Sequence, residues 1–445
     1  MTQGQQNPTR KDRFIARLVS FLTRSVYRKV EVYVPPDLPT TAPLLTVSNH
    51  FGGFADALVL LDVFPRRPGI VARDVIWKIP VAGRLMTWIG GIPVHKPEDR
   101  TAATSNDEMF GSCYAALADN GHILIFPEGV TRNEPSIAPV KTGAARIALG
   151  AQAHGVAKLA ILPVGIHYED KAALRSRVFV NVGLPIEVDD YVANEFDEGA
   201  VAGGANDREA VKVLTDSIET ALRRAAPDYA NWSEAHLLAA GADITLRNAV
   251  ADSPRAVGIG LRDRLANTLA DRPVEHRRQI CDAVSAYQDD LDSVGFSDAE
   301  LGGALDARRF TRSFLTQLFI GVLLLPFAFV GAVINVIPFL VVKAVGALRV
   351  APSMLSTLKP IAAFAAFGIT WCVVIWLSTM SFGWRGGVIA FVLLPVYLAA
   401  VVLSVERGAL LWRLVRRRRA AAVQSTMSGQ LLARRQAVVE TVLAA

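Results

Sequence analysis

The chain has 445 residues, a formal net charge of +6, 51% hydrophobic residues and a mean hydropathy of +0.31. This hydropathy is high for a wholly soluble protein, and a basic balance points to nucleic acid or an anionic membrane surface as partner. The sequence contains no zinc-finger spacing and no aromatic-basic single-strand signature, so nucleic-acid binding is not expected. Its three cysteines, Cys113, Cys281 and Cys372, lack metal-clip spacing and are expected to be reduced thiols in a cytosol-facing protein.

Residues 1–29 open with a polar stretch, expected to be disordered, and continue as a basic amphipathic helix. Apolar side chains recur at helical spacing between Lys11 and Tyr27, and arginines occupy the other positions. Two interpretations stay open: a helix packed on its own domain, and a helix lying on the bilayer surface. The segment has no long apolar core and is not expected to be a cleavable signal peptide.

Residues 30–200 alternate short β-branched runs with helical patterns. Strands are expected at 44–48, 122–126, 159–168 and 177–183, and helices at 54–64, 106–120 and 142–155. This alternation predicts an α/β domain with a mixed, mostly parallel sheet flanked by helices. Residues 207–310 then show helical spacing with charged faces and almost no strand signal, which predicts a helical segment without a catalytic pattern.

A membrane domain is expected at 313–405, because uncharged runs cover 313–342, 360–384 and 386–405. About 20 apolar residues span a bilayer, so the second and third runs predict transmembrane helices at about 360–382 and 386–405. The first run has cations at both ends and is interrupted by Pro326, Asn335 and Pro338. We therefore expect 313–342 to form a re-entrant or interfacial hairpin that enters and returns.

The distribution of charge predicts the topology. Arg416 to Arg419 lie in the basic tail 406–445, which the positive-inside rule places in the cytoplasm. Counting back two spans places Lys359 on the same side and the loop around Arg385 on the far side. The expected location is therefore the cell membrane, as a multi-pass protein whose catalytic domain is cytoplasmic.

The first chemical motif combines a histidine and a carboxylate at the end of an expected strand. His50 and Asp56 would not face each other on one straight helix, but Gly52 and Gly53 permit a bend between them. Asp56 would then lie in a first helical turn, where the dipole favours a carboxylate. A neutral imidazole can take a proton from a hydroxyl, and a carboxylate on its other nitrogen fixes the tautomer. The alternative is a pair of hydrogen-bonded loop groups.

Two further stretches supply groups for an anionic ligand. Lys96 follows a short apolar run and places a cation beside the expected sheet end. Beyond the strand at 122–126, Glu128 offers acceptors for a polyol hydroxyl, and Gly129 lets a ligand approach the backbone. Arg132 offers a planar fork for phosphate.

Four motifs in order resemble the boxes of the glycerophospholipid acyltransferases, the glycerol-3-phosphate and lysophosphatidate acyltransferase superfamily. They are Asn49–His50 with Asp56, Gly91-Ile-Pro-Val, Phe126-Pro-Glu-Gly and Leu162-Pro-Val-Gly. The resemblance is strong over about 30–190 and continues faintly into the C-terminal segments. The chain departs from the common pattern at two points. Five residues instead of four separate His50 from Asp56, as in a minority branch, and Lys96 stands where an arginine is usual.

The resemblance implies transfer of a fatty acyl group from a thioester, acyl-CoA or acyl-ACP, to a hydroxyl of glycerol-3-phosphate or 1-acylglycerol-3-phosphate. It implies that His50 is the general base oriented by Asp56, and that Glu128, Gly129, Arg132 and Lys96 bind the acceptor. No cofactor or metal is expected. The chain lacks a G-x-S-x-G elbow, so direct transfer is expected. Two alternatives stay open: another lysophospholipid or glycolipid acceptor, and an inactive membrane-anchored lipid-binding protein.

Overall fold

The computed structural model describes residues 9–36, 38, 42–94, 107–196, 203–249, 257–295, 297–301 and 307–444. The chain divides into two compact units. Unit 1 comprises Met1–Trp232 together with Ala351–Thr357, and unit 2 comprises Ser233–Val350 together with Leu358–Ala445. Lys96 lies outside the described residues.

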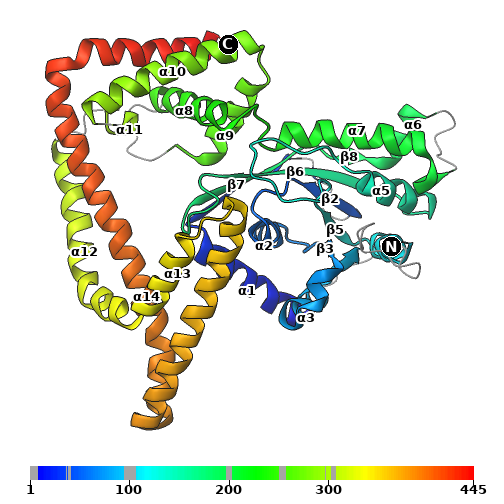
Figure 1. Cartoon of the computed structure of the whole chain (residues 1–445), viewed down its shortest axis with the longest axis horizontal. Coiled ribbons are helices and arrows are strands. Elements are labelled where there is room, and N and C mark those ends of the chain that lie inside the picture. The colour runs from blue at the N-terminus through cyan, green and yellow to red at the C-terminus, as the bar shows by residue number, and fades with distance from the viewer. Residues whose placement is uncertain are drawn as a thin grey trace. The chain divides into compact units, whose positions relative to one another are not determined.

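Unit 1 is built on one eight-stranded sheet with the order β1-β7-β6-β2-β5-β3-β4, and β8 pairs with β6 (Figure 1). The strands are β1 (Lys29–Tyr33), β2 (Leu44–Ser48), β3 (Gly69–Arg73), β4 (Ile92–Val94), β5 (His122–Ile125), β6 (Ala160–Tyr168), β7 (Arg177–Val182) and β8 (Ile186–Glu187). Only the β6–β7 and β6–β8 pairs of this described sheet are antiparallel. The prediction of a mixed, mostly parallel sheet is confirmed.

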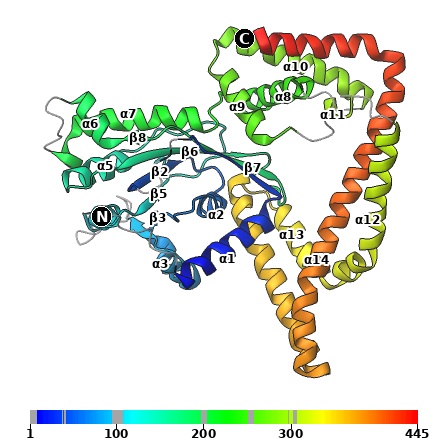
Figure 2. The same ribbon diagram turned by 180° about the vertical axis from the view of Figure 1, so that it is seen from behind.

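Helices cover both faces of this sheet. They are α1 (Arg10–Val26), α2 (Phe54–Val63), α3 (Pro80–Trp88), α4 (Asp107–Ala118), α5 (Gly143–Ala153), α6 (Val188–Glu195) and α7 (Arg208–Ala225). Helices α5 and α7 lie on one face, and α1 and α2 lie on the other (Figures 1 and 2). Every residue of the central strand β2 is consequently buried, as expected for a strand covered on both sides.

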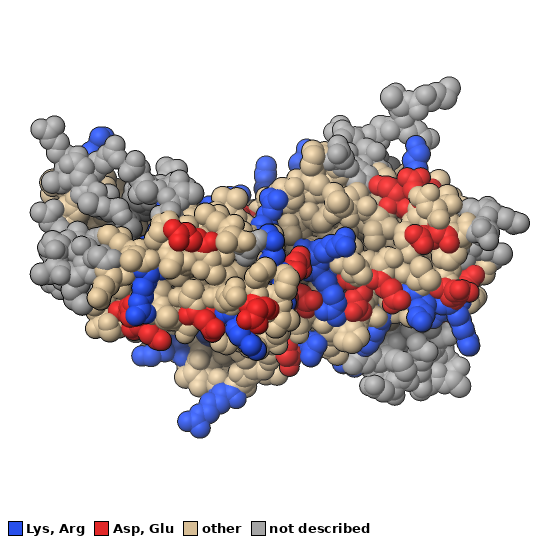
Figure 3. All heavy atoms as spheres, turned by 90° about the horizontal axis from the view of Figure 1, so that it is seen from above, with Lys and Arg blue, Asp and Glu red and all other residues tan. Residues whose placement is uncertain are grey.

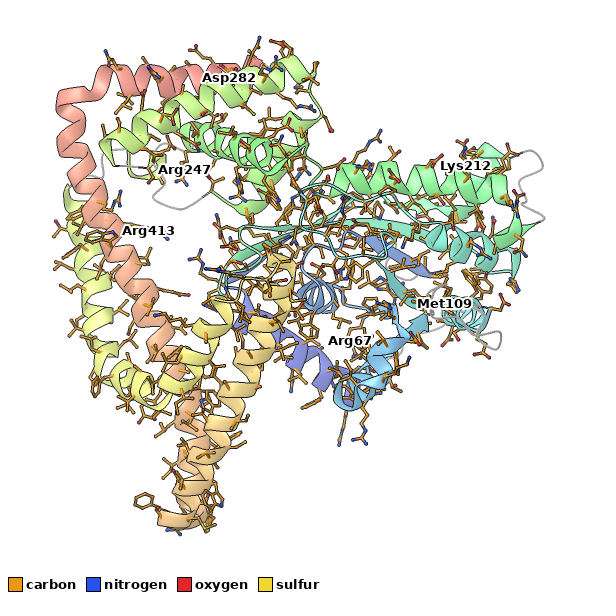
Figure 4. The ribbon with its side chains drawn as sticks, in the orientation of Figure 1. Arg67, Met109, Lys212, Arg247, Asp282 and Arg413 are labelled. Atoms are coloured by element: carbon orange, nitrogen blue, oxygen red, sulfur yellow. The ribbon has the colours of Figure 1, made fainter. Side chains whose placement is uncertain are left out.

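Helices α1 and α7 show how amphipathic spacing positions these layers. On α7, Leu214, Ile218 and Leu222 form the buried stripe, whereas Lys212 is exposed on the side away from the sheet (Figure 4). On α1, a stripe that includes Val19 packs towards α2, in agreement with the first of the two interpretations of this helix.

Unit 2 is helical in its described part. Its elements are α8 (Trp232–Ala249), α9 (Ile259–Ala270), α10 (Val274–Val294), α11 (Asp298–Leu301), α12 (Ala307–Ile334), α13 (Val336–Gly346) and most of α14 (Pro352–Ala444). Arg435 of α14 donates to Asp298 Oδ1 over 2.7 Å, and Tyr287 of α10 donates to the same oxygen over 3.0 Å. This buried cluster fastens the C-terminal end of α14 to α10 and α11. Basic and acidic side chains are interspersed on the face drawn in Figure 3.

Two helical stretches of the described chain are long and apolar enough to cross a membrane, Phe310–Ile334 and Pro352–Arg416. Gly383 has a left-handed backbone (φ 69°) that breaks α14, and the helix folds back there as a hairpin (Figure 1). The break lies between the two expected transmembrane helices. Pro326, where the sequence indicated an interruption, lies inside the continuous helix α12, which ends beside Asn335.

Polar groups fasten the apolar helices of unit 2 to one another. The buried Asn335 accepts a hydrogen bond from Trp371 Nε1 over 3.0 Å, and its amide donates to Gly331 O over 2.8 Å. Arg407 on α14 donates to Gln317 Oε1 on α12 over 2.6 Å. Such hydrogen bonds and small residues are typical of helix packing in lipid, where apolar burial gives little drive to associate.

Candidate active site

Three adjacent parallel strands bring the predicted chemistry to one edge of the sheet. Strand β2 lies between β5 and β6 and runs parallel to both. His50 follows the end of β2, Glu128 follows the end of β5, and Tyr168 closes β6. The helices after β2 and β5 leave towards opposite faces, as Figure 1 shows, and ligands of open α/β sheets bind at such a point, outside the carboxyl ends of the strands.

The structure brings His50 and Asp56 into contact. His50 Nδ1 lies 2.9 Å from Asp56 Oδ2. The chain turns through Gly52 and Gly53, and Gly53 has a φ of 59°, which favours glycine. Helix α2 begins at Phe54, so Asp56 lies in its first turn, where the helix dipole stabilises a carboxylate.

Asp56 is fully buried, and three donors surround its carboxylate. Oδ2 accepts from Gly52 N over 2.8 Å as well as from His50, and Oδ1 accepts from Tyr168 Oη over 2.5 Å. Burial and the charge of Asp56 raise the pKa of Tyr168 well above its ordinary value of 10, so the phenol remains a donor. An ionised carboxylate can only accept hydrogen bonds, so His50 carries its proton on Nδ1 and has a lone pair on Nε2.

The His50 ring is held in place but reachable. It stacks on Phe126 with 4.2 Å between ring centroids, and its side chain is 22% exposed. None of the described residues forms a hydrogen bond with Nε2. The arrangement therefore presents a basic nitrogen to an incoming hydroxyl while Asp56 supports the charge that the ring would gain.

Glu128 is buried, and its contacts are internal. Oε1 accepts from His50 N over 2.9 Å, and Oε2 accepts from Ala138 N over 2.9 Å. Burial raises the pKa of this carboxyl group, and the two backbone donors oppose the rise. Glu128 thus fixes the backbone of His50 from the neighbouring strand, in a setting unlike the ligand-facing one expected from sequence.

The loop after Glu128 carries the other predicted binding residues. Gly129 has a φ of 66°, and a Cβ there would lie 2.7 Å from Lys141 Nζ. Arg132 N donates to His50 O over 3.2 Å, which places this residue beside the histidine. The Arg132 side chain is half-buried and pairs with Glu134 over 3.2 Å, in a rim contact of the kind that contributes little to stability.

Three residues of the site were not among the predicted site residues, although Asn49 stands in the first motif. Tyr168 holds Asp56, as described above. Asn49 is buried and exchanges hydrogen bonds with both the N–H and the carbonyl of Ile166, which locks the end of β2 to β6. The sequence signal for Tyr168 is a polar residue at the end of a buried strand, and the signal for Asn49 is the motif that it shares with His50.

Lys171 is the third, and it is a second cation near His50. Its Nζ donates to Arg132 O over 3.3 Å and lies 6.0 Å from the centre of the Phe51 ring. Burial lowers the pKa of Lys171, and the negative charges of Asp56 and Glu134 oppose that effect. Within the described residues, no group of three or more His, Cys, Asp or Glu side chains is placed to hold a metal ion.

Part of this chain is similar to known proteins. Residues 29–167 match the Acyltransferase family. Glycerol-3-phosphate O-acyltransferase 2 of Saccharomyces cerevisiae is 36% identical over 128 residues, which cover 28% of this chain and 16% of that protein. The 1-acyl-sn-glycerol-3-phosphate acyltransferase alpha of Mus musculus is 28% identical over 172 residues, which cover 38% of this chain and 56% of that protein. The chain thus spans less than a fifth of the yeast protein and just over half of the mouse protein.

Among solved structures, the 1-acyl-sn-glycerophosphate acyltransferase of Thermotoga maritima superposes with a TM-score of 0.32 at 15% identity, covering 47% of this chain and 80% of that one. Residues 29–167 form an acyltransferase-family domain, and the distant homologues of this chain are glycerol-3-phosphate and 1-acylglycerol-3-phosphate acyltransferases.

Proposed function

We propose that the protein is a membrane-bound O-acyltransferase that moves a fatty acyl group from acyl-CoA or acyl-ACP to a hydroxyl of glycerol-3-phosphate or 1-acylglycerol-3-phosphate. The observation that carries this proposal is the 2.9 Å contact between His50 Nδ1 and the buried Asp56, with Nε2 free of described partners. The match of 29–167 to the acyltransferase family supports the reaction class.

The proposed reaction proceeds by direct attack. His50 Nε2 takes the proton of the acceptor hydroxyl as that oxygen bonds to the thioester carbonyl carbon. Asp56 stabilises the imidazolium that forms. The tetrahedral intermediate then collapses, the carbon–sulfur bond breaks, and the thiolate leaves and recovers the proton from the imidazolium. General base catalysis of this kind contributes about 10²–10⁴-fold to the rate.

The remaining residues of the site divide into positioning and binding groups. Glu128 holds the His50 backbone, and Gly129, where a Cβ would lie 2.7 Å from Lys141 Nζ, lets the glycerol portion approach the backbone. Arg132 and Lys171 neutralise the acceptor phosphate from beside His50, where Arg132 supplies a bidentate fork and Lys171 a point charge. Lys96 is assigned to the same phosphate from sequence alone.

Exposed apolar surface supports a site that works at a bilayer. Phe14 and Phe21 are 60% and 62% exposed, and they are seven residues apart on one face of α1. The ring centres of Phe14 and Trp88 of α3 lie 6.3 Å apart, and Ile79, at the start of that helix, and Leu85, within it, are also exposed. An apolar patch with arginines along the same helix fits the headgroup boundary of an anionic membrane.

The domain order that we propose follows the sequence: an amphipathic start at 1–29, the acyltransferase domain at 30–200, a helical segment at 207–310, a membrane domain at 313–405 and a basic tail at 406–445. Two membrane-crossing helices meet at the Gly383 turn, with the tail and the catalytic domain cytoplasmic. The chain reverses direction between α12 and α13, as drawn in Figure 1, which fits a hairpin at 313–342, but the apolar stretch Phe310–Ile334 of α12 is itself long enough to cross a membrane.

One assay tests the function. Purified full-length protein in lipid nanodiscs is given radiolabelled acyl-CoA or acyl-ACP with glycerol-3-phosphate or 1-acylglycerol-3-phosphate. His50→Ala should lower kcat by about 10²–10⁴-fold and leave acceptor binding largely intact. His276→Ala, an exposed histidine on α10, serves as the matched control and should behave as wild type.

Two results would overturn the assignment. Full activity of His50→Ala would remove the general base from the mechanism. Wild-type protein that transfers to neither acceptor, nor to a panel of other lysophospholipids and glycolipids, would favour a lipid-binding protein without catalysis.

A further inference from the structure

A short segment far along the chain lies against the catalytic turn. Residues 351–357 belong to unit 1, and α14 starts within them. Thr357 Oγ1 accepts a hydrogen bond from Phe54 N over 3.2 Å, and Ser356 Oγ donates to Gly52 O over 2.9 Å. These contacts join positions about 300 residues apart at the turn between His50 and Asp56.

The contact with Thr357 supplies what the turn itself lacks. The first N–H groups of a helix need acceptors, and an N-cap side chain usually provides one. The N-cap of α2 is Gly53, which has no side chain to do so. Thr357 therefore caps α2 from outside, at the helical turn that holds Asp56.

The fit is too close for a larger residue at the turn. A Cβ on Gly53 would lie 2.6 Å from Thr357 Oγ1, and a Cβ on Gly52 would lie 2.8 Å from Asp56 Oδ1 and Tyr168 Oη. Ser356 is buried, and its hydroxyl lies within hydrogen-bond distance of Ser353 O (2.7 Å) as well as of Gly52 O. Because its one proton is divided between these two acceptors, the hydrogen bond from Ser356 to the turn is weaker than the one that Thr357 accepts.

The same segment also reaches the other side of His50. Ser353 N donates to Asn133 Oδ1 over 3.0 Å. Asn133 follows Arg132, whose N–H donates to the His50 carbonyl over 3.2 Å. Segment 351–357 thus contacts both backbone segments that hold the histidine, the glycine turn and the loop after β5.

We propose that Thr357, assisted by Ser356, is a positioning residue for the His50–Asp56 pair, so that the catalytic turn is complete only when segment 351–357 is docked on it. Neither residue touches the reacting atoms. Both act through the backbone of residues 52–54, which sets the distance between His50 Nδ1 and Asp56 Oδ2. The kinetic consequence of this proposal depends on the acyl transfer proposed above, whereas its structural consequence does not.

The test compares three variants of full-length protein in nanodiscs. Thr357→Val keeps the shape and removes the acceptor, and Thr357→Ser restores a hydroxyl. Thr379→Val makes the same change elsewhere on α14, where the hydroxyl donates to Ile375 O of the same helix. Hydrogen–deuterium exchange reports the amides of residues 50–57, and steady-state kinetics separate kcat from KM.

We expect Thr357→Val to raise exchange at residues 50–57 and to lower kcat about tenfold, with KM for both substrates within about twofold. Ser356→Ala should add a smaller loss, and Thr357→Ser and Thr379→Val should match wild type. Unchanged exchange and unchanged kcat in the Ser356→Ala, Thr357→Val double variant would overturn the proposal. Raised exchange in a protein without any transferase activity would keep the docking and reject the acyl transfer instead.

Discussion

Replacing Asp56 by Asn isolates the charge of the carboxylate from its geometry. Asp56 receives three donors, from His50 and Gly52 at Oδ2 and from Tyr168 at Oδ1. An Asn side chain has one oxygen and one NH₂ group, so only one edge can still accept.

The orientation of the introduced amide group depends on these three donors. With its oxygen towards Tyr168, the NH₂ group would face the Gly52 N–H, and that buried donor would be left unsatisfied at about 1–3 kcal/mol. With its oxygen towards His50 and Gly52, the NH₂ group would face the Tyr168 hydroxyl, which can rotate and accept. The second orientation keeps every hydrogen bond and the tautomer of His50, and it removes only the counter-charge for the imidazolium.

Asp56→Asn should therefore fold with little loss of thermal stability and lose kcat by about 10²–10⁴-fold, with KM within about threefold. Stopped assays of thiol release give kcat, and a thermal melt in the same nanodiscs reports folding. Asp62→Asn, on the same helix but facing Arg24 of α1, controls for the substitution itself. A melt like wild type combined with kcat within twofold of wild type would refute the role assigned to the carboxylate.

Three further predictions address other parts of the chain. Burial lowers the pKa of His122 to about 4, below its unfolded value of about 6.5. The stability that this neutral ring contributes is therefore complete above pH 6.5. As pH falls towards 4, about 3 kcal/mol of it is lost. The melting temperature of His122→Gln should depend less on pH across that window than that of His276→Gln, and equal slopes would contradict this. Arg132→Ala should raise the acceptor KM about tenfold at unchanged kcat, and an unchanged KM would reassign the residue. Single cysteines at Arg312 and Lys343 should react with an impermeant reagent from the same side of the membrane, whereas reaction from opposite sides would discard the hairpin at 313–342.

The buried strands β2 and β6 were predicted from the sequence, whereas β1, at one edge of the sheet, was not. Strands β2 and β6 have apolar, β-branched runs that ended within about one residue of their predicted limits. Strand β1 was missed because charged and apolar side chains alternate in its short sequence, KVEVY. Its pairing partner in the sheet is β7, which follows some 150 residues later. Local pattern carries no information about a partner so distant.

The contacts of the candidate site were also predictable only where the residues lie close together in the sequence. The bend that brings His50 to Asp56 was predictable because both residues and the glycine pair lie in one short stretch. Tyr168 and Thr357 contact that stretch from 112 and about 300 residues away, and only the fold reveals them. Glu128 was placed correctly at the sheet edge, but the direction of its carboxylate depends on two backbone donors that the sequence does not display.

The turn between His50 and Asp56 contains five residues, and the contacts at this turn show how it is held. Gly53 has a φ of 59° and Asp56 lies in the first helical turn, and across these five residues the carboxylate still contacts the imidazole at 2.9 Å. A longer turn has more conformational freedom to lose, and each ordered residue costs about 1–2 kcal/mol of backbone entropy. The hydrogen bonds from Gly52 N to Asp56 and from Phe54 N to Thr357 act on the flexible positions themselves. Residues 351–357 therefore lie where a turn of this length can be stabilised from outside.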